Sequence, residues 1–228
     1  MERSKNYKNI WNAKVGFFDG RNSDGSFVEP FQATEWRNVY VEGDAWQWLW
    51  SVPQDVPGLI ELMGGKDTFL KRLDEFFSLS HKAPDSLMPD KYYWHGNEPD
   101  LHAAYRFLWT GRPDRTQEEV RWIMKKKYAA KGAGIDGNDD GGTLAAWYVF
   151  SSMGFFPLPP DNKYYFGSPL FTKISILIGK KRFAILAPGA SEQNLYIRGA
   201  KLNGRIFDSP YIEWRDIAAG GTLELMMT

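Results

Sequence analysis

Carboxylate and aromatic side chains occur together at three places in this chain, and they are its best candidates for chemistry. The three stretches are residues 40–48, 95–102 and 137–148. Carboxylates transfer protons and bind hard cations. Flat aromatic rings offer large apolar faces with polar edges, which suit the apolar faces of pyranoses. The combination therefore indicates carbohydrate chemistry.

Glu42 is the candidate acid of the first stretch. It follows the β-like run 38–41, opens a predicted helix, and is followed by Trp46, Trp48 and Trp50. In a purely structural interpretation it is a first-turn acid stabilised by the helix dipole. In the functional interpretation the neighbouring indoles exclude water, which would raise the pKa of the Glu42 carboxyl and let it act as a general acid.

Oxygen ligands for a cation are concentrated in the second stretch. Asn97, Glu98 and Asp100 are closely spaced, and His95 and His102 flank them. The structural alternative is that Asn97 is an N-cap and the two acids belong to the first turn of a helix. The two histidines leave zinc open, although their spacing matches no standard zinc pattern. The oxygen ligands favour calcium.

Asp139 and Asp140 lie side by side in a Gly-rich turn before an apolar helix. Adjacent carboxylates repel, so a cation, a water network or a bound hydroxyl would have to compensate them; turn and capping chemistry is the alternative. The loop 132–142 resembles an EF-hand in composition but lacks its terminal Glu and ligand register. Glycoside hydrolysis uses two carboxyl groups across the scissile bond. Nothing local brings Glu42 to this pair.

Apolar spacing predicts helices through the first two thirds of the chain, after a loop-rich segment 1–40. The predicted helices are 42–51, 54–63, 67–79, 99–110, 115–129 and 143–153. The expected N-caps are Asp55, Asp67 and Thr143, with Pro57 in a first turn and a capping box at 116–119. Short loops between successive helices indicate antiparallel αα-hairpins.

After Pro157 the apolar period becomes that of β-strands, and Gly, Pro and Asn separate the segments. Asn203-Gly204 is the strongest hairpin signal among them. We therefore expect a mainly α fold with a C-terminal β module. Residues 1–157 would form a partial (α/α) toroid of helix hairpins, and residues 158–228 a small antiparallel sheet.

Composition excludes several classes of protein. The chain has 228 residues, zero formal net charge and no Cys, so disulfides, Cys-ligated zinc and a thiol nucleophile are ruled out. A nucleic-acid partner would need a basic face, and none is indicated. No apolar run reaches the length of a membrane span.

The three stretches together resemble glycoside hydrolase family 92, the exo-acting, calcium-dependent, inverting α-mannosidases. The resemblance is carried by Tyr40–Gln47, by 95–102 and by 137–142 with Ala146–Phe155, and continues through 167–171 and 202–204. It implies a mannose-containing glycan as substrate and calcium as cofactor. It also implies that full-length relatives are exported to the periplasm or the cell exterior.

The resemblance assigns roles to residues of this chain. Glu42 matches the general acid, and Asp139 and Asp140 match the acidic pair that activates water. Asn97 and Glu98 match the region that helps to hold calcium. The residues expected in or near the sugar subsites are Trp46, Trp94, His95 and Trp147.

Two departures from the family pattern stand out. Asp44 replaces the usual Asn, which would add a charge near the acid, and Trp48 replaces the usual Tyr. Family members are also roughly three times longer, so the N-terminal sandwich and half of the toroid are expected to be missing. The terminal hairpins would then expose Leu59, Leu62 and Phe69. The chain would therefore self-associate, bind a partner fragment, or use its N-terminal forty residues as a cover.

Three interpretations follow. The chain is an α-mannosidase catalytic region, or a non-catalytic remnant that binds carbohydrate or a partner subunit, or a structural helical domain whose acids are caps.

Overall fold

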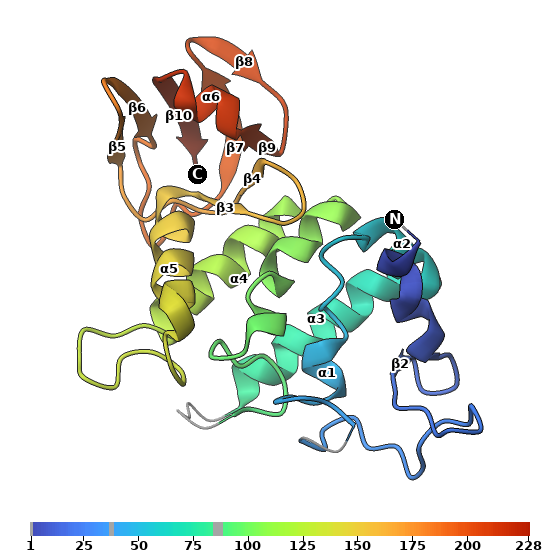
Figure 1. The fold of residues 1–228 in the computed structure, drawn as a ribbon. Helices are drawn as coiled ribbons and strands as arrows, with labels where there is room; N and C mark the ends of the chain where they lie inside the picture. The colour runs from blue at the N-terminus through green and yellow to red at the C-terminus, as the bar shows by residue number, and fades with distance from the viewer. Residues whose placement is uncertain (1, 37–38, 84–88) are drawn as a thin grey trace. The chain divides into compact units, whose positions relative to one another are not determined.

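A computed structural model describes residues 2–36, 39–83 and 89–228 of the chain. They form a mixed α/β structure with three small sheets and two compact units (Figure 1). Unit 1 consists of Met1–Thr110 and Ala129–Asp139, and unit 2 of Gly111–Tyr128 and Asp140–Thr228. Two segments that precede the predicted boundary at residue 157, residues 111–128 and 140–157, belong with the sheets in unit 2. Within the described residues, no helix is long and apolar enough to cross a membrane.

Unit 1 is helical with a small N-terminal hairpin. Its elements are η1 (Arg3–Ile10), β1 (Trp11–Asn12), β2 (Phe17–Phe18), α1 (Ala45–Trp48), α2 (Val56–Leu62), α3 (Lys66–Lys82), η2 (Glu98–Asp100) and η3 (Ala103–Thr110). Aromatic rings fill its core: Trp50 packs edge-on against Phe69, and Phe77 contacts both Tyr93 and Phe107. Burial of this apolar surface is the main stabilising term of the unit.

The helix prediction for this unit is correct in part. α2 begins as expected, since Asp55 caps it by accepting a hydrogen bond from the Gly58 backbone N–H at 3.0 Å. α3 begins one residue before the expected cap Asp67, with Gly65 at the N-cap. The helix predicted over 99–110 is instead two 3₁₀ segments, and the helix predicted over 42–51 is the single turn α1.

Unit 2 joins two helices to the β module. α4 (Pro113–Lys126) and α5 (Thr143–Met153) are followed by β3 (Phe155–Pro157), β4 (Lys163–Phe166), β5 (Lys173–Ile178), β6 (Lys181–Leu186), β7 (Ile197–Leu202), β8 (Arg205–Phe207), β9 (Tyr211–Glu213), α6 (Trp214–Ala218) and β10 (Gly221–Met227). The bounds of α5 agree with the sequence prediction. The expected capping box at 116–119 is absent, because Arg112 occupies the N-cap and makes no side-chain cap.

The strands of unit 2 form two sheets, with orders β5-β6-β10-β7-β8 and β3-β4-β9. The Asn203-Gly204 hairpin is confirmed: both residues have positive φ, and Leu202 pairs with Arg205 across the turn. The prediction of a purely antiparallel module is wrong, because β10 pairs with β6 in parallel. Phe183, Ile185 and Leu223 are central to the buried core of the unit.

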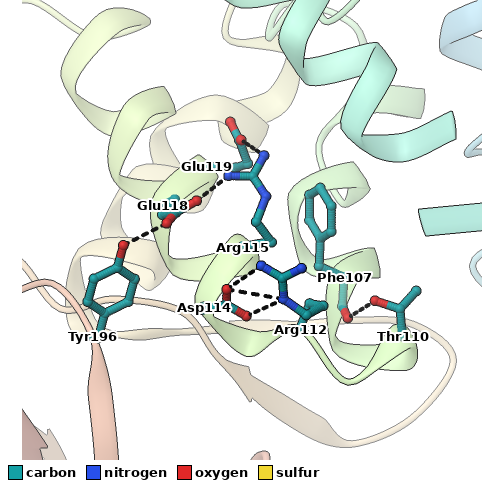
Figure 2. A network of polar contacts seen from close by, with 8 residues as sticks. All are labelled: Phe107, Thr110, Arg112, Asp114, Arg115, Glu118, Glu119 and Tyr196. Atoms are coloured by element: carbon teal, nitrogen blue, oxygen red, sulfur yellow. Dashed lines mark hydrogen bonds and ion pairs between the residues drawn. The ribbon is translucent and has the colours of Figure 1, made fainter. Parts of the chain in front are cut away.

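A polar network ties α4 to the chain that follows it within unit 2 (Figure 2). Arg115 forms ion pairs with Glu118 and Glu119, and Glu118 accepts a hydrogen bond from the Tyr196 hydroxyl at 2.6 Å. The Glu119 side chain is 1% exposed, so its pairing with Arg115 compensates a buried charge.

Two expectations about the helical region are not met. Leu59 and Phe69 are fully buried and Leu62 is partly buried, so the exposed apolar face predicted at these residues is wrong. Their burial comes from packing inside unit 1, which sequence spacing alone could not reveal. No toroid is visible in the described residues.

Candidate active site

Glu42 stands at the exposed turn between residues 39–41 and α1. Its φ is +48°, in the left-handed region that side chains other than glycine seldom adopt. The dehydrated environment expected for its carboxyl is absent. The expectation failed because Trp46 and Trp50 turn into the core, where Trp46 stacks on Phe76.

Hydrogen bonds fix the backbone on both sides of this turn. The Asn97 side-chain amide donates to the Glu42 carbonyl oxygen at 2.7 Å, and the Trp48 indole N–H donates to the Val41 carbonyl oxygen at 3.0 Å. Gly43 lies between these two donors. A Cβ at Gly43 would lie 2.7 Å from Trp48 Nε1 and 3.1 Å from Asn97 Nδ2, so only glycine fits there.

Asn97 is the centre of the network. Its Nδ2 donates to the Glu42 carbonyl and, at 2.9 Å, to Gln47 Oε1. Asn97 occupies the N-cap position of η2 but makes no side-chain cap bond there, so the capping interpretation of its side chain is wrong. Both amide N–H groups have acceptors, and only Oδ1 remains to bind a cation.

The 93–100 loop that carries Asn97 is held by buried polar contacts. Asp100 is fully buried and accepts a hydrogen bond from the Trp94 backbone N–H at 2.9 Å. The Tyr93 hydroxyl and His95 Nδ1 lie 2.6 Å apart, both side chains being buried. His102 contacts the Trp50 carbonyl at 3.2 Å, and burial together with the Arg106 charge lowers its pKa from 6.5 to about 3.

The third acidic loop packs against the second inside unit 1. A Cβ at Gly96 would meet the Asp136 carbonyl oxygen at 2.8 Å, and one at Gly137 would meet the Trp94 ring at 3.0 Å. Backbone therefore touches backbone where the two loops cross, and glycine is required at both positions. The segment leading to Asp139 thus lies against the loop of Asn97, which in turn binds the turn of Glu42.

Asp139 is the last residue of unit 1, and Asp140 is the first residue of the second segment of unit 2. Asp140, Gly141 and Gly142 have successive positive φ values of 38°, 69° and 88°. Thr143, predicted as the cap of α5, is its first residue; its hydroxyl donates to the Asp140 carbonyl at 2.7 Å. Neither acid is the N-cap of α5, because Gly142 occupies that position.

Burial distinguishes the predicted sugar-binding residues from one another. Trp46 and Trp147 are core residues, with Trp147 stacked on Tyr128 inside unit 2, and His95 is fully buried. These positions favour structural roles for all three. Trp94 is partly exposed beside the third loop, and of the predicted sugar-binding residues it has the best access to a ligand.

Asn97 and Glu98 do not by themselves make a calcium site. Calcium takes six to eight oxygen ligands, roughly three times what these two side chains supply. Among the residues that the structure describes, no group of three or more His, Asp or Glu residues could hold a metal ion. Calcium therefore stays a prediction from the resemblance.

Comparison with known proteins establishes the class. A profile of the glycosyl hydrolase family 92 catalytic domain matches residues 1–228, so the chain belongs to this family. A family 92 α-mannosidase from Bacteroides thetaiotaomicron, solved with mannoimidazole, is 32% identical with a TM-score of 0.89, covering 100% of this chain and 32% of that one.

Two further relatives agree. A family 92 inverting mannosidase from the same bacterium is 36% identical with a TM-score of 0.88, covering 99% of this chain and 33% of that one. An uncharacterised secreted glycosidase of Arthroderma benhamiae is 28% identical over 100% of this chain and 32% of its own length. The chain thus spans about a third of the length of these relatives.

Proposed function

We propose that this chain carries the catalytic groups of an inverting α-mannosidase that removes terminal α-linked mannose from glycans. Glu42 is the general acid, and Asp139 with Asp140 supplies the general base. Family membership supports the reaction class. One relative is described as an inverting mannosidase and another binds a mannose mimic.

The observation that carries the assignment to residues is backbone strain. Among described residues other than glycine, positive φ occurs at Glu42, Asp140 and Asn203. Asn203 is explained by its hairpin turn. The other two are a proposed acid and a proposed base, and strained backbone concentrates at functional sites.

The reaction needs one proton donor and one proton acceptor. The Glu42 carboxyl protonates the glycosidic oxygen as the bond from that oxygen to C1 breaks, and a carboxylate of the Asp139/Asp140 pair takes a proton from the attacking water. The new C1–O bond forms on the opposite face, so the product is inverted. A bound sugar that excludes water from Glu42 would favour the protonated, donating form.

The wider expectations are parts of the same proposal. Trp94 offers an aromatic surface beside the site, and calcium bound near Asn97 Oδ1 and Glu98 would hold mannose hydroxyls. The helices of this chain would complete a toroid with other segments of a longer, exported protein. A non-catalytic fragment that binds carbohydrate is the alternative.

The test is hydrolysis of aryl and alkyl α-mannosides, with the product anomer read by NMR. We expect β-mannose to appear first. Glu42→Gln should lower kcat by about 10²–10⁴-fold for alkyl mannosides, because poor leaving groups depend most on protonation. The kcat of this variant should fall much less for mannosides with a good leaving group. Equal losses for both substrates would rule out Glu42 as the acid, and glycan binding without hydrolysis would favour the alternative.

A further inference from the structure

We propose that Gln47, a residue outside the predicted site, is the positioning residue that holds Glu42 in its left-handed conformation through the Asn97 amide. The kinetic consequence of this inference rests on the proposed function. Its structural consequence, the conformation of Glu42, rests on the geometry of unit 1 alone.

Gln47 is fixed at every polar atom. It is fully buried in α1, and its backbone N–H donates to Asp44 Oδ1 at 3.1 Å. Its side-chain Nε2 donates to the carbonyl oxygens of Asp90 and Tyr92 at 3.0 Å and 2.9 Å. Two carbonyl acceptors on one nitrogen allow only one orientation of the amide, with Nε2 toward them and Oε1 away.

That orientation determines the orientation of Asn97. Gln47 Oε1 can only accept, so Asn97 must turn Nδ2 toward it, at 2.9 Å. The second N–H of the same Nδ2 then meets the Glu42 carbonyl at 2.7 Å. Reversing the Asn97 amide would place its oxygen against two other oxygens. Gln47 therefore determines which atom of Asn97 faces the Glu42 backbone.

Trp48, the residue after Gln47 in α1, restrains the same turn at a second point. The Trp48 indole binds the Val41 carbonyl, so consecutive residues of one helical turn restrain the consecutive carbonyls of Val41 and Glu42. The backbone direction at Glu42 sets where its exposed carboxyl points. A carboxyl that donates a proton in the transition state must be held close to the accepting oxygen. Loss of Gln47 should therefore misplace the proton donor and leave it chemically intact.

The structural test needs no enzyme activity. Carbon chemical shifts of Glu42 report its φ, and we compare them in the wild-type chain, in Gln47→Met and in Asn97→Ser. Gln117→Met is the matched control, because Gln117 is a buried glutamine of unit 2 whose Oε1 accepts from the Ile197 N–H at 3.1 Å. Should Gln47→Met fail to fold, Gln47→Leu takes its place, since it also removes the acceptor oxygen and both N–H donors from a side chain of similar volume.

We expect the Glu42 shifts to move toward extended or averaged values in the Gln47 and Asn97 variants and to stay unchanged in Gln117→Met. Unchanged Glu42 shifts in the Gln47 variant would overturn the inference, whatever the Asn97→Ser variant shows.

The kinetic test separates positioning from general destabilisation. With alkyl and dinitrophenyl α-mannosides, Gln47→Met should lose about tenfold more kcat on the alkyl substrate, because only that substrate needs the proton from Glu42. KM should change little. Equal losses on both substrates in a folded variant would overturn the positioning role. If the wild-type chain hydrolyses neither, the proposed function fails, and the shift measurement alone decides the inference.

Discussion

Asp44 has a buried carboxyl group, and we expect it to lower the free energy of unfolding as the pH rises. It is 1% exposed at the N-cap of α1, where Oδ1 accepts from the Gln47 N–H. Oδ2 is buried with no hydrogen-bond partner among the described residues. Burial raises the pKa of Asp44 from 3.8 to about 7, and the nearby Asp90 charge adds to the rise.

The sign of the effect follows from proton binding. Between pH 4 and pH 7 the folded chain keeps a proton on Asp44 that the unfolded chain has released, so raising the pH favours unfolding. The contribution of Asp44 to the free energy of unfolding is therefore complete below its pKa in the unfolded chain. It is lost as the pH rises through its pKa in the folded chain. A pKa rise of this size corresponds to about 4 kcal/mol at most.

Asp44→Asn removes the charge and keeps an oxygen for the cap. We expect the variant and the wild type to differ little at about pH 4, and the variant to gain up to about 4 kcal/mol by about pH 8. The measurement is urea unfolding across this range, followed by tryptophan fluorescence and circular dichroism. Taking the difference between the two proteins cancels every other titrating group that they share.

Asp55→Asn is the matched control at the N-cap of α2. Both Asp55 oxygens have partners there, Gly58 N–H and the Tyr7 hydroxyl, so this variant should gain no stability at high pH. The reasoning about Asp44 would be refuted by a stability difference that does not change with pH, or by Asp44→Asn being the less stable protein at about pH 8.

Three further outcomes are expected. Burial lowers the pKa of His102 from 6.5 to about 3, so the wild type should lose stability as the pH falls through this range. In His102→Gln, the free energy of unfolding measured in urea should fall less steeply over the same pH range. Arg115→Met should cost about 3 kcal/mol in denaturant unfolding because it removes the guanidinium that pairs with the buried Glu119 side chain. Arg112→Met breaks the half-exposed Asp114 pair and should cost under about 1 kcal/mol. Equal costs would contradict the burial argument. Calorimetric titration should show weaker calcium binding in Glu98→Gln, and tight zinc binding with no calcium response would contradict the oxygen-ligand assignment.

Local patterns predicted the local parts of this fold. The bounds of α5 and the hairpin at Asn203-Gly204 follow from apolar spacing and turn chemistry within a few residues. The parallel pairing of β10 with β6 did not follow, because it joins segments separated by three intervening strands. Such pairing depends on how the whole sheet assembles, and no short stretch of sequence encodes it.

The candidate site divides in the same way. Residue types and spacing singled out Glu42, Asn97 and the Asp139/Asp140 pair, but the contact between Asn97 and Glu42 spans 55 positions. Gln47 was missed altogether. Its one signal is a polar residue between two tryptophans on a helix, and that signal acquires meaning only once the carbonyls of Asp90 and Tyr92 are placed beside it.

The three strained residues differ in what maintains them. The Asn-Gly turn maintains Asn203 together with Thr222, which accepts a hydrogen bond from the Asn203 N–H and donates one to Asn203 Oδ1. Asp140 is followed by two left-handed glycines and bonded by Thr143, all within four residues. Glu42 depends on the amide of Asn97, 55 positions away, and no left-handed glycine follows it. A left-handed residue other than glycine costs about 1–3 kcal/mol, comparable to the one or two hydrogen bonds that oppose it. The conformation of Glu42 is therefore open to change by substitutions outside its own loop, at Asn97 and at Gln47.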